Sequence, residues 1–223
     1  MNREVLERWV MSAVGLFYVG AVLFINGLML LGRISAKSAG IFNVLVGGLQ
    51  CVMPLMILAQ SGGDSATLHA TFPILLFGFT YLYVGIANLA GISGEGIGWF
   101  SLFVAAATVY AAIDSFFAGD LTFGVIWLAW GVLWLLFFAL LALEKSALTP
   151  FAGWLVTLWA IPTTSVPAVL LLRDAWVPGA AGAVPLLVLL VVLAIMAWFM
   201  TRRSVIAHET LNARKEELAG QTA

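Results

Sequence analysis

The chain has 223 residues, of which 63% are hydrophobic and 9% are charged, and its formal net charge is −1 at pH 7. Soluble domains carry about 25% charged residues, so this composition indicates an integral membrane protein. The near-neutral charge excludes a nucleic-acid-binding protein, the low polarity excludes a disordered chain, and the single cysteine excludes a disulfide framework or a cysteine-based zinc site.

Seven stretches are long and apolar enough to cross a bilayer, which takes about 20 helical residues. They cover residues 11–31, 39–60, 71–91, 98–118, 122–143, 149–172 and 183–201. The fold expected is an all-α integral membrane protein, with a compact bundle of six transmembrane helices in a channel domain over 11–172. A loop and an extra seventh C-terminal transmembrane helix follow over 173–201. A short extracytoplasmic head (1–10) and a cytoplasmic polar tail (202–223) flank them.

The charged head precedes an apolar stretch that is too long for a signal peptide and lacks a clean small-residue cleavage pattern. We therefore expect the first stretch to be a membrane helix.

Positive charges predict the orientation of the helices. Seven lysines and arginines fall in the first loop, the fifth loop and the tail, whereas Arg3, Arg8 and Arg173 lie on the other side. Positively charged loops stay in the cytoplasm, so we expect the N-terminus outside and the C-terminus inside.

Ionisable side chains are missing from the centres of all seven stretches, and Asp114, near the outer end of the fourth, comes closest. This absence argues against a retinal protein, a haem cytochrome, an acid relay and a charged pore. It also leaves no visible pair of nucleophile and base, so we expect neither an enzyme nor a bound cofactor or metal.

Aromatic side chains recur on one face of the fifth stretch at spacings of four, three and four residues, which places them in line on a helix. The third and first stretches repeat this register. The residues are Phe123, Trp127, Trp130 and Trp134 in the fifth stretch, Phe77, Tyr81, Val84 and Asn88 in the third, and Val19, Leu23 and Asn26 in the first. A lone stripe of this kind usually means packing. Together with the absence of charge, the stripes predict a path for a small, neutral, planar solute, to which Tyr81, the indole N–H groups and Asn26 or Asn88 offer hydrogen bonds.

Glycines near the middle of the spans predict close approach of helix backbones. They are Gly47, Gly48, Gly78, Gly85 and Gly131. In the sixth stretch Pro162 and Pro167 each remove a backbone donor, and the hydroxyls of residues 163–165 can satisfy the freed carbonyls. The residues leave open whether this feature shapes a path or only kinks a helix.

Two unbroken aromatic motifs carry a resemblance to a known family. Residues 77–83 read FGFTYLY and residues 126–134 read IWLAWGVLW, and both are similar to signatures of the AmiS/UreI family of bacterial urea and short-chain amide channels. Shorter matches follow in family order at 18–20, 26–27, 43, 46–49, 99–105 and 167–168.

The resemblance implies a six-helix protomer in the bacterial inner membrane, a solute path through each protomer, and a homohexamer. It implies passive conduction of urea or small amides towards a cytoplasmic urease or amidase. It also implies that Phe77, Tyr81, Trp127, Trp130 and Trp134 line the narrow parts of the path, which Val19, Leu23 and Asn26 also face.

The chain departs from the family pattern in its seventh span and in its ionisable residues. In acid-gated urea members the outer loops are rich in histidine and acids, and an acid lies in the sixth helix. Here the outer loops before the sixth helix offer only Asp64, His69 and Asp120, and Trp159 stands where that acid would be. We therefore expect no strong acid gating and favour the amide-channel branch.

Two other functions stay open. An ion-coupled transporter of amides or related small nitrogen compounds would need a titratable element, and Asp114 is the candidate. A sensor or assembly partner that transports nothing would use the polar tail to bind a cytosolic protein.

Overall fold

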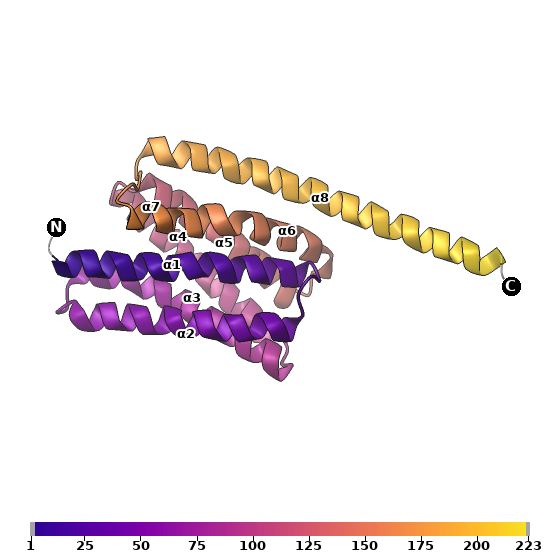
Figure 1. Cartoon of the computed structure of the whole chain (residues 1–223), viewed down its shortest axis with the longest axis horizontal. Coiled ribbons are helices and arrows are strands. Elements are labelled where there is room, and N and C mark those ends of the chain that lie inside the picture. The colour runs from indigo at the N-terminus through magenta and orange to yellow at the C-terminus, as the bar shows by residue number, and fades with distance from the viewer. Residues whose placement is uncertain (1–2, 222–223) are drawn as a thin grey trace.

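The computed structural model describes the backbone of residues 3–221 and the side chains of 11–65, 67–69 and 71–203. The elements are helical throughout this part of the chain (Figure 1). In order they are α1 (Arg3–Leu30), α2 (Ala36–Gln60), α3 (Ser65–Ala90), α4 (Glu95–Phe117), α5 (Leu121–Leu141), η1 (Ser146–Leu148), α6 (Thr149–Ala160), η2 (Ile161–Ser165), α7 (Val166–Leu172) and α8 (Ala180–Gln221). Seven helical segments of the described part are long and apolar enough to span a membrane, which confirms the prediction from the sequence.

Polar caps define where several helices begin and end. The side chains of Ser35, Asp64 and Asp120 accept hydrogen bonds from backbone N–H groups in the first turns of α2, α3 and α5. Gly91 ends α3 with φ of 69°, in the left-handed region that glycine adopts without steric cost. The helices therefore begin a few residues before most of the predicted apolar stretches, because the caps precede the apolar residues.

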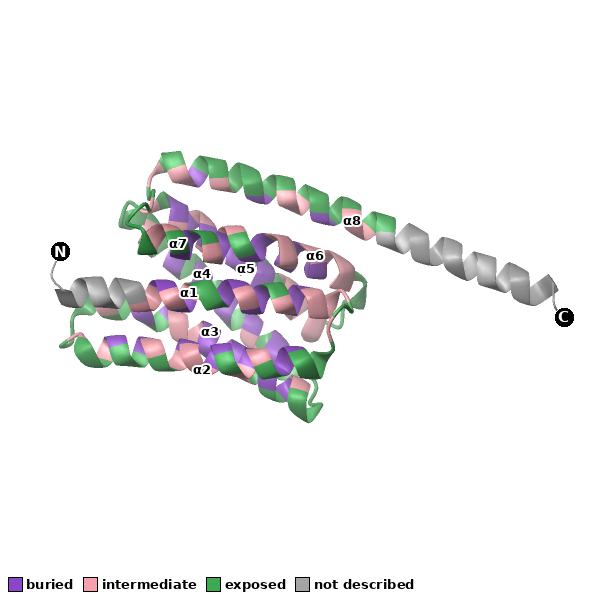
Figure 2. Ribbon diagram, in the orientation of Figure 1, coloured by how far each residue is buried: buried purple, intermediate pink, exposed green. Residues whose placement is uncertain are grey.

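The first six spans form a closed ring. Each helix packs on its neighbours in chain order, and α6 closes the ring by packing on both α5 and α1. The hairpins α2–α3 and α4–α5 have the most extensive contacts. Buried and exposed residues alternate along the ribbons of these helices (Figure 2), and buried residues of α2, α3, α4 and α5 share one core cluster. The bundle thus has an interior that all six spans share.

The seventh span, α8, lies outside this ring against α5 and α6 and extends beyond the ends of the other helices (Figure 1). It has 42 residues, which at about 1.5 Å per residue is about twice the thickness of a bilayer core. The expected boundaries after residues 10 and 201 both fall inside helices, because α1 begins at Arg3 and α8 continues to Gln221.

Close packing of α2 on α3 depends on glycine, as the sequence predicted for Gly47 and Gly85. A Cβ atom on Gly47 would lie 2.6 Å from the backbone nitrogen of Leu82, and one on Gly85 would lie 2.8 Å from the backbone nitrogen of Val44. The prediction is wrong for Gly48, where a Cβ atom would meet no atom within 4 Å. Gly48 faces away from the contact because it is one residue further around the helix.

The sixth span is interrupted by the π-helical turn η2 between α6 and α7. At its end the N–H of Val166 bonds to the carbonyl of Ile161, five residues earlier. As predicted, two hydroxyls satisfy carbonyls of the preceding turn: Thr163 donates to Trp159 and Thr164 to Ala160. Ser165 differs, because its hydroxyl donates to the carbonyl of Phe17 in α1, at 3.3 Å.

Candidate functional site

Two cavities lie inside the ring, one towards each end of the bundle. The first, of about 170 Å³, lies at the end where α1 stops and α4 begins; its lining includes Leu23, Asn26, Tyr81 and Asn88. The second, of about 310 Å³, lies at the opposite end; its lining includes Val19, Trp127 and Phe123. Since a water molecule occupies about 30 Å³ in the liquid, each cavity has room for a small solute.

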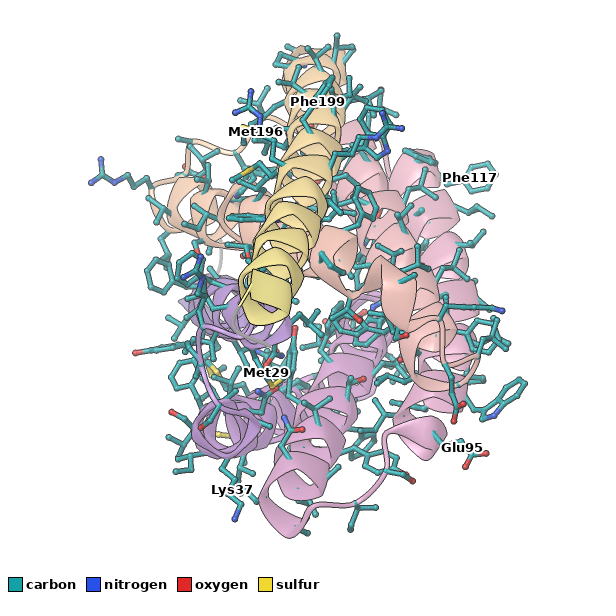
Figure 3. The ribbon with its side chains drawn as sticks, turned by 90° about the vertical axis from the view of Figure 1, so that its right-hand side faces the viewer. Met29, Lys37, Glu95, Phe117, Met196 and Phe199 are labelled. Carbon is teal, nitrogen blue, oxygen red and sulfur yellow. The ribbon has the colours of Figure 1, made fainter. Side chains whose placement is uncertain are left out.

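Figure 3 looks along the bundle towards the end that holds the 170 Å³ cavity. Met29 points into the bundle there, whereas Lys37 and Glu95 point away from it. Met29 lines this cavity, and no charged side chain does among those that the structure describes. The interior at this end is therefore uncharged.

An aromatic cluster separates the two cavities. We call Phe77 and Tyr81 of α3 and Trp127, Trp130 and Trp134 of α5 the aromatic partition. Phe77 is its centre, with ring centroids 5.1 Å from Trp130 and 5.8 Å from both Trp127 and Trp134. Phe77 and Trp130 line both cavities. A solute passing from one cavity to the other would have to pass these two rings.

All eleven residues of the stripes lie on the wall of at least one cavity, and Val84 lines the first. Leu23, Asn26, Tyr81, Asn88 and Trp134 line the first, Val19, Phe123 and Trp127 the second, and Phe77 and Trp130 both. Their part in conduction stays a prediction.

The polar atoms of the interior differ from the prediction in two places. The one N–H of the Trp130 indole donates to the hydroxyl of Thr163, at 3.1 Å, so it offers no hydrogen bond to a solute. The amide of Asn26 exchanges two hydrogen bonds with that of Asn43, at 3.0 and 2.6 Å, which occupies both ends of the Asn26 side chain. Asn88 donates weakly to the sulfur of Met29, at 3.4 Å.

Tyr81 keeps an unpaired hydroxyl within the described part of the chain, and its bonding to a solute stays a prediction. Its ring is 2% exposed, and its Oη atom is the one buried side-chain polar atom without a hydrogen-bond partner among the described residues. An unpaired buried hydroxyl costs about 1–3 kcal/mol, so such groups are rare in folded proteins. Tyr81 lines the 170 Å³ cavity directly beside the ring of Phe77.

The mouth of the 310 Å³ cavity holds ionisable groups that the chain brings together from three helices. His69, Asp114 and Asp120 line it. A ring nitrogen of His69 lies 2.9 Å from the Tyr110 hydroxyl. Asp120 accepts from the indole of Trp176 at 2.8 Å and caps α5. Hydrogen bonds thus hold His69 and Asp120 in place at one end of the interior.

Sequence reasoning missed Gln50 and Trp176, which shape this interior, and it missed the bond of Thr163 to Trp130. Gln50 lines the 310 Å³ cavity and donates to the carbonyl of Gly15, at 2.7 Å. Thr163 holds Trp130, and Trp176 stacks on Phe123 with ring centroids 4.6 Å apart. A glutamine within an apolar span was a usable signal, since polar side chains are costly in lipid. The Thr163 bond joins two spans and the Trp176 bond joins two loops, so neither leaves a pattern in the sequence.

Trp159, which the resemblance matched to the acid of acid-gated members, contacts the seventh span. Its ring is buried, and its indole N–H donates to the carbonyl of Leu190 in α8, at 3.0 Å. The position therefore serves the contact between α6 and α8.

Comparisons with known proteins agree with this architecture. A sequence profile described as AmiS/UreI family transporter matches residues 11–175. The chain is 54% identical to the transporter protein AmiS2 of Rhodococcus erythropolis over 84% of its own length and 93% of the relative's. It is 46% identical to an amidate substrates transporter protein of Mycolicibacterium smegmatis, over 86% of this chain and 91% of that one.

A solved structure matches as well. The urea channel of Helicobacter pylori, determined by electron cryomicroscopy in a closed state, superposes with a TM-score of 0.68 at 36% identity. The match covers 74% of this chain and all of that one. A curated relative from the same species, at 36% identity over 73% of this chain and 97% of its own, is an acid-activated urea channel. The chain is thus a multi-pass membrane protein, and it belongs to the AmiS/UreI family of transporters.

Proposed function

We propose that the protein is a passive channel that conducts urea or short-chain aliphatic amides through each protomer. The solute passes from the 310 Å³ cavity to the 170 Å³ cavity across the aromatic partition. Flat rings make close dispersion contacts with a planar solute without binding it tightly, and weak binding permits fast release. The relatives named for urea and for amidate substrates support this solute class.

The observation that carries the proposal is that Tyr81 lines the 170 Å³ cavity and has a buried hydroxyl with no hydrogen-bond partner among the described residues. A hydroxyl both donates and accepts hydrogen bonds. Urea and amides present a carbonyl oxygen and N–H groups within one small plane, so they can satisfy this hydroxyl as they pass. Among the described residues no charged side chain lines this cavity, so no protein charge would balance that of an ion there.

The amide branch is favoured over the acid-gated branch. The identity to the two actinobacterial transporters, 54% and 46%, exceeds the 36% to the acid-activated channel. The sixth span carries no acid, and Trp159 is committed to α8. Conduction is therefore proposed to change little with pH, although His69, Asp114 and Asp120 line the outer cavity.

The proposal also covers the orientation of the channel, its cytoplasmic partner and its oligomeric state. Positive charge places the C-terminus in the cytoplasm of a bacterial inner membrane, so the 310 Å³ cavity opens outwards. The solute then reaches a cytoplasmic amidase or urease, and the protomers form a hexamer. Consider a reporter enzyme that is active only in the periplasm and is fused to the C-terminus. Activity of this reporter would contradict the orientation. A monomeric mass in mild detergent would contradict the ring.

An ion-coupled transporter is the second candidate, because Asp114 lines the 310 Å³ cavity and its carboxylate makes no hydrogen bond within the part of the chain that the structure describes. Coupling predicts uptake against a gradient that stops when a protonophore is added. A passive channel equilibrates solute and ignores the protonophore.

Flux into proteoliposomes tests the proposal. Purified protein should speed the entry of urea or acetamide well above that of glycerol. The rate should be similar at neutral and acidic pH and insensitive to a protonophore. Permeability no greater than that of empty vesicles, with folded protein present, would overturn the proposal, and a steep rise in acid would overturn the claim about gating.

A further inference from the structure

Trp130 lies at the narrowest point of the proposed path, because with Phe77 it borders both cavities. Its ring is 4% exposed and packs edge-on against the rings of Phe77 and Trp127, with centroids 5.1 and 4.9 Å away. The rotation of this indole therefore sets the opening between the cavities. Neither neighbouring ring offers an acceptor atom to the indole N–H of Trp130. The ring of Phe77 has no polar atom, and the indole of Trp127 can only donate.

The polar contact that fixes this rotation comes from another span. The indole N–H of Trp130 donates to the hydroxyl oxygen of Thr163, at 3.1 Å. The same hydroxyl donates its own hydrogen to the carbonyl of Trp159, at 2.7 Å. Because the hydroxyl hydrogen is committed to that carbonyl, the oxygen lone pairs are left pointing elsewhere, and one of them receives the indole N–H.

The position of Thr163 depends on the π-helical turn. Thr163 lies at the middle of η2 between Pro162 and Thr164, and its side chain is completely buried. Turns of this kind insert one extra residue into a helix and change which side chains face its neighbours. The π-helical turn η2 therefore places Thr163 where its hydroxyl can bond to Trp130 of α5.

We propose that Thr163 is a positioning residue: its hydroxyl holds the indole of Trp130 in one rotation at the junction of the two cavities and so sets which solutes pass. The effect on flux rests on the proposed function, but the effect on the indole does not. Without the hydroxyl, the indole N–H of Trp130 is buried without an acceptor. The indole ring then rotates towards another acceptor, and this rotation alters the opening between the two cavities.

Spectroscopy tests the contact without any assumption about transport. In protein labelled with ¹⁵N-tryptophan, the Trp130 indole signal is the one missing from Trp130→Phe. We expect Thr163→Val to shift this signal and Thr163→Ser to restore it. Thr164→Val is the matched control, because it removes a hydroxyl from the same turn that bonds only to Ala160. In the unsubstituted protein, the Trp130 indole N–H should exchange with D₂O more slowly than that of Trp127.

Flux through the same variants tests the consequence. Thr163→Val should reduce the ratio of urea to glycerol permeability by about fivefold, the size expected for one lost buried hydrogen bond. Thr163→Ser and Thr164→Val should keep the ratio. In a Trp130→Phe background Thr163→Val should change nothing further, since the N–H is already gone.

Three results would overturn the inference: an unshifted Trp130 signal in Thr163→Val, fast exchange of that N–H in the unsubstituted protein, or the same loss of selectivity in Thr164→Val. A wild-type protein that conducts no solute would instead overturn the proposed function and leave the spectroscopic result to stand by itself.

Discussion

The hydroxyl of Tyr81 and the aromatic rings beside it make different contributions to the path. In the channel that we propose, the rings of Phe77 and Trp130 limit the width of the path, and the Tyr81 hydroxyl, which has no partner among the described residues, bonds to the solute. Trp130 supplies shape alone, since its N–H is bonded to Thr163. The hydrogen bonding expected of the indoles thus falls mainly to Tyr81.

Replacing Tyr81 by Phe removes this hydroxyl and nothing else. Urea or acetamide flux should fall by about fivefold, equivalent to about 1 kcal/mol for one hydrogen bond to the passing solute. The protein should be as stable as before or more so, because no bond within it is broken. Stopped-flow flux and thermal unfolding in detergent measure the two effects.

Tyr83→Phe is the control for this substitution. Tyr83 lies on the same helix, half a turn away, and is 38% exposed on the outside of the ring. Equal flux in Tyr81→Phe and the unsubstituted protein, or an equal loss in Tyr83→Phe, would remove Tyr81 from the solute path.

The residues of the candidate site could be predicted to a large extent because they follow helical periodicity. A spacing of three or four residues is enough to put Trp127, Trp130 and Trp134 on one face. The sequence does not say which atoms on a neighbouring helix meet that face. The bonds of Trp130 to Thr163 and of Asn26 to Asn43 join residues 33 and 17 positions apart, so they depend on how the spans pack.

Helix pairs in the ring owe their close approach to small residues on particular faces. α2 approaches α3 at Gly47, where a Cβ atom would reach the backbone of Leu82, while its neighbour Gly48 faces open space. The spans themselves could be predicted from hydropathy, but the difference between these two glycines could not. Both are mid-span, and only the rotation of α2 about its axis separates them.

The pair Gly47→Ala and Gly48→Ala tests this packing. Gly47→Ala should destabilise the protein by about 1–3 kcal/mol, because the added methyl group forces α2 and α3 apart. Gly48→Ala should stabilise it by about 0.5–1 kcal/mol, because alanine loses less conformational freedom in a helix. Thermal unfolding in detergent measures both, and equal effects would mean that α2 is rotated differently against α3.

The π-helical turn of the sixth span could be predicted only as an irregularity. Pro162 and Pro167 indicated lost backbone bonds, and the hydroxyls of Thr163 and Thr164 were identified as their replacements. Both prolines are compatible with a kink or with a wide turn. Packing of η2 on α1, where Ser165 reaches Phe17, accompanies the wide turn.

The whole molecule combines a closed ring of six spans with one span outside it. The family profile ends at residue 175, and α8 begins at Ala180. α8 contributes no residue to either cavity within the described part of the chain. It docks on the ring through Trp159 and Leu190. The two cavities of the proposed path are therefore lined by the ring of six spans, and the seventh span packs on the outside of that ring.

Solute that passes inside the ring must cross the 170 Å³ cavity. Chemical labelling of a cysteine in the wall of this cavity can block it. Ala87 of α3 is buried and lines that cavity, and it can be replaced by cysteine after Cys51 is replaced by alanine. A thiol reagent added from the cavity's open end should then fill the cavity. Ser93→Cys, exposed in the loop at the same end, is the control.

The decisive measurement is urea or acetamide flux into proteoliposomes that contain the Ala87→Cys variant, before and after the reagent. A path through each protomer predicts that labelling abolishes flux in Ala87→Cys and leaves it unchanged in Ser93→Cys. Undiminished flux through fully labelled Ala87→Cys protein would show that the solute crosses elsewhere, for example between protomers, and would contradict the path across the aromatic partition.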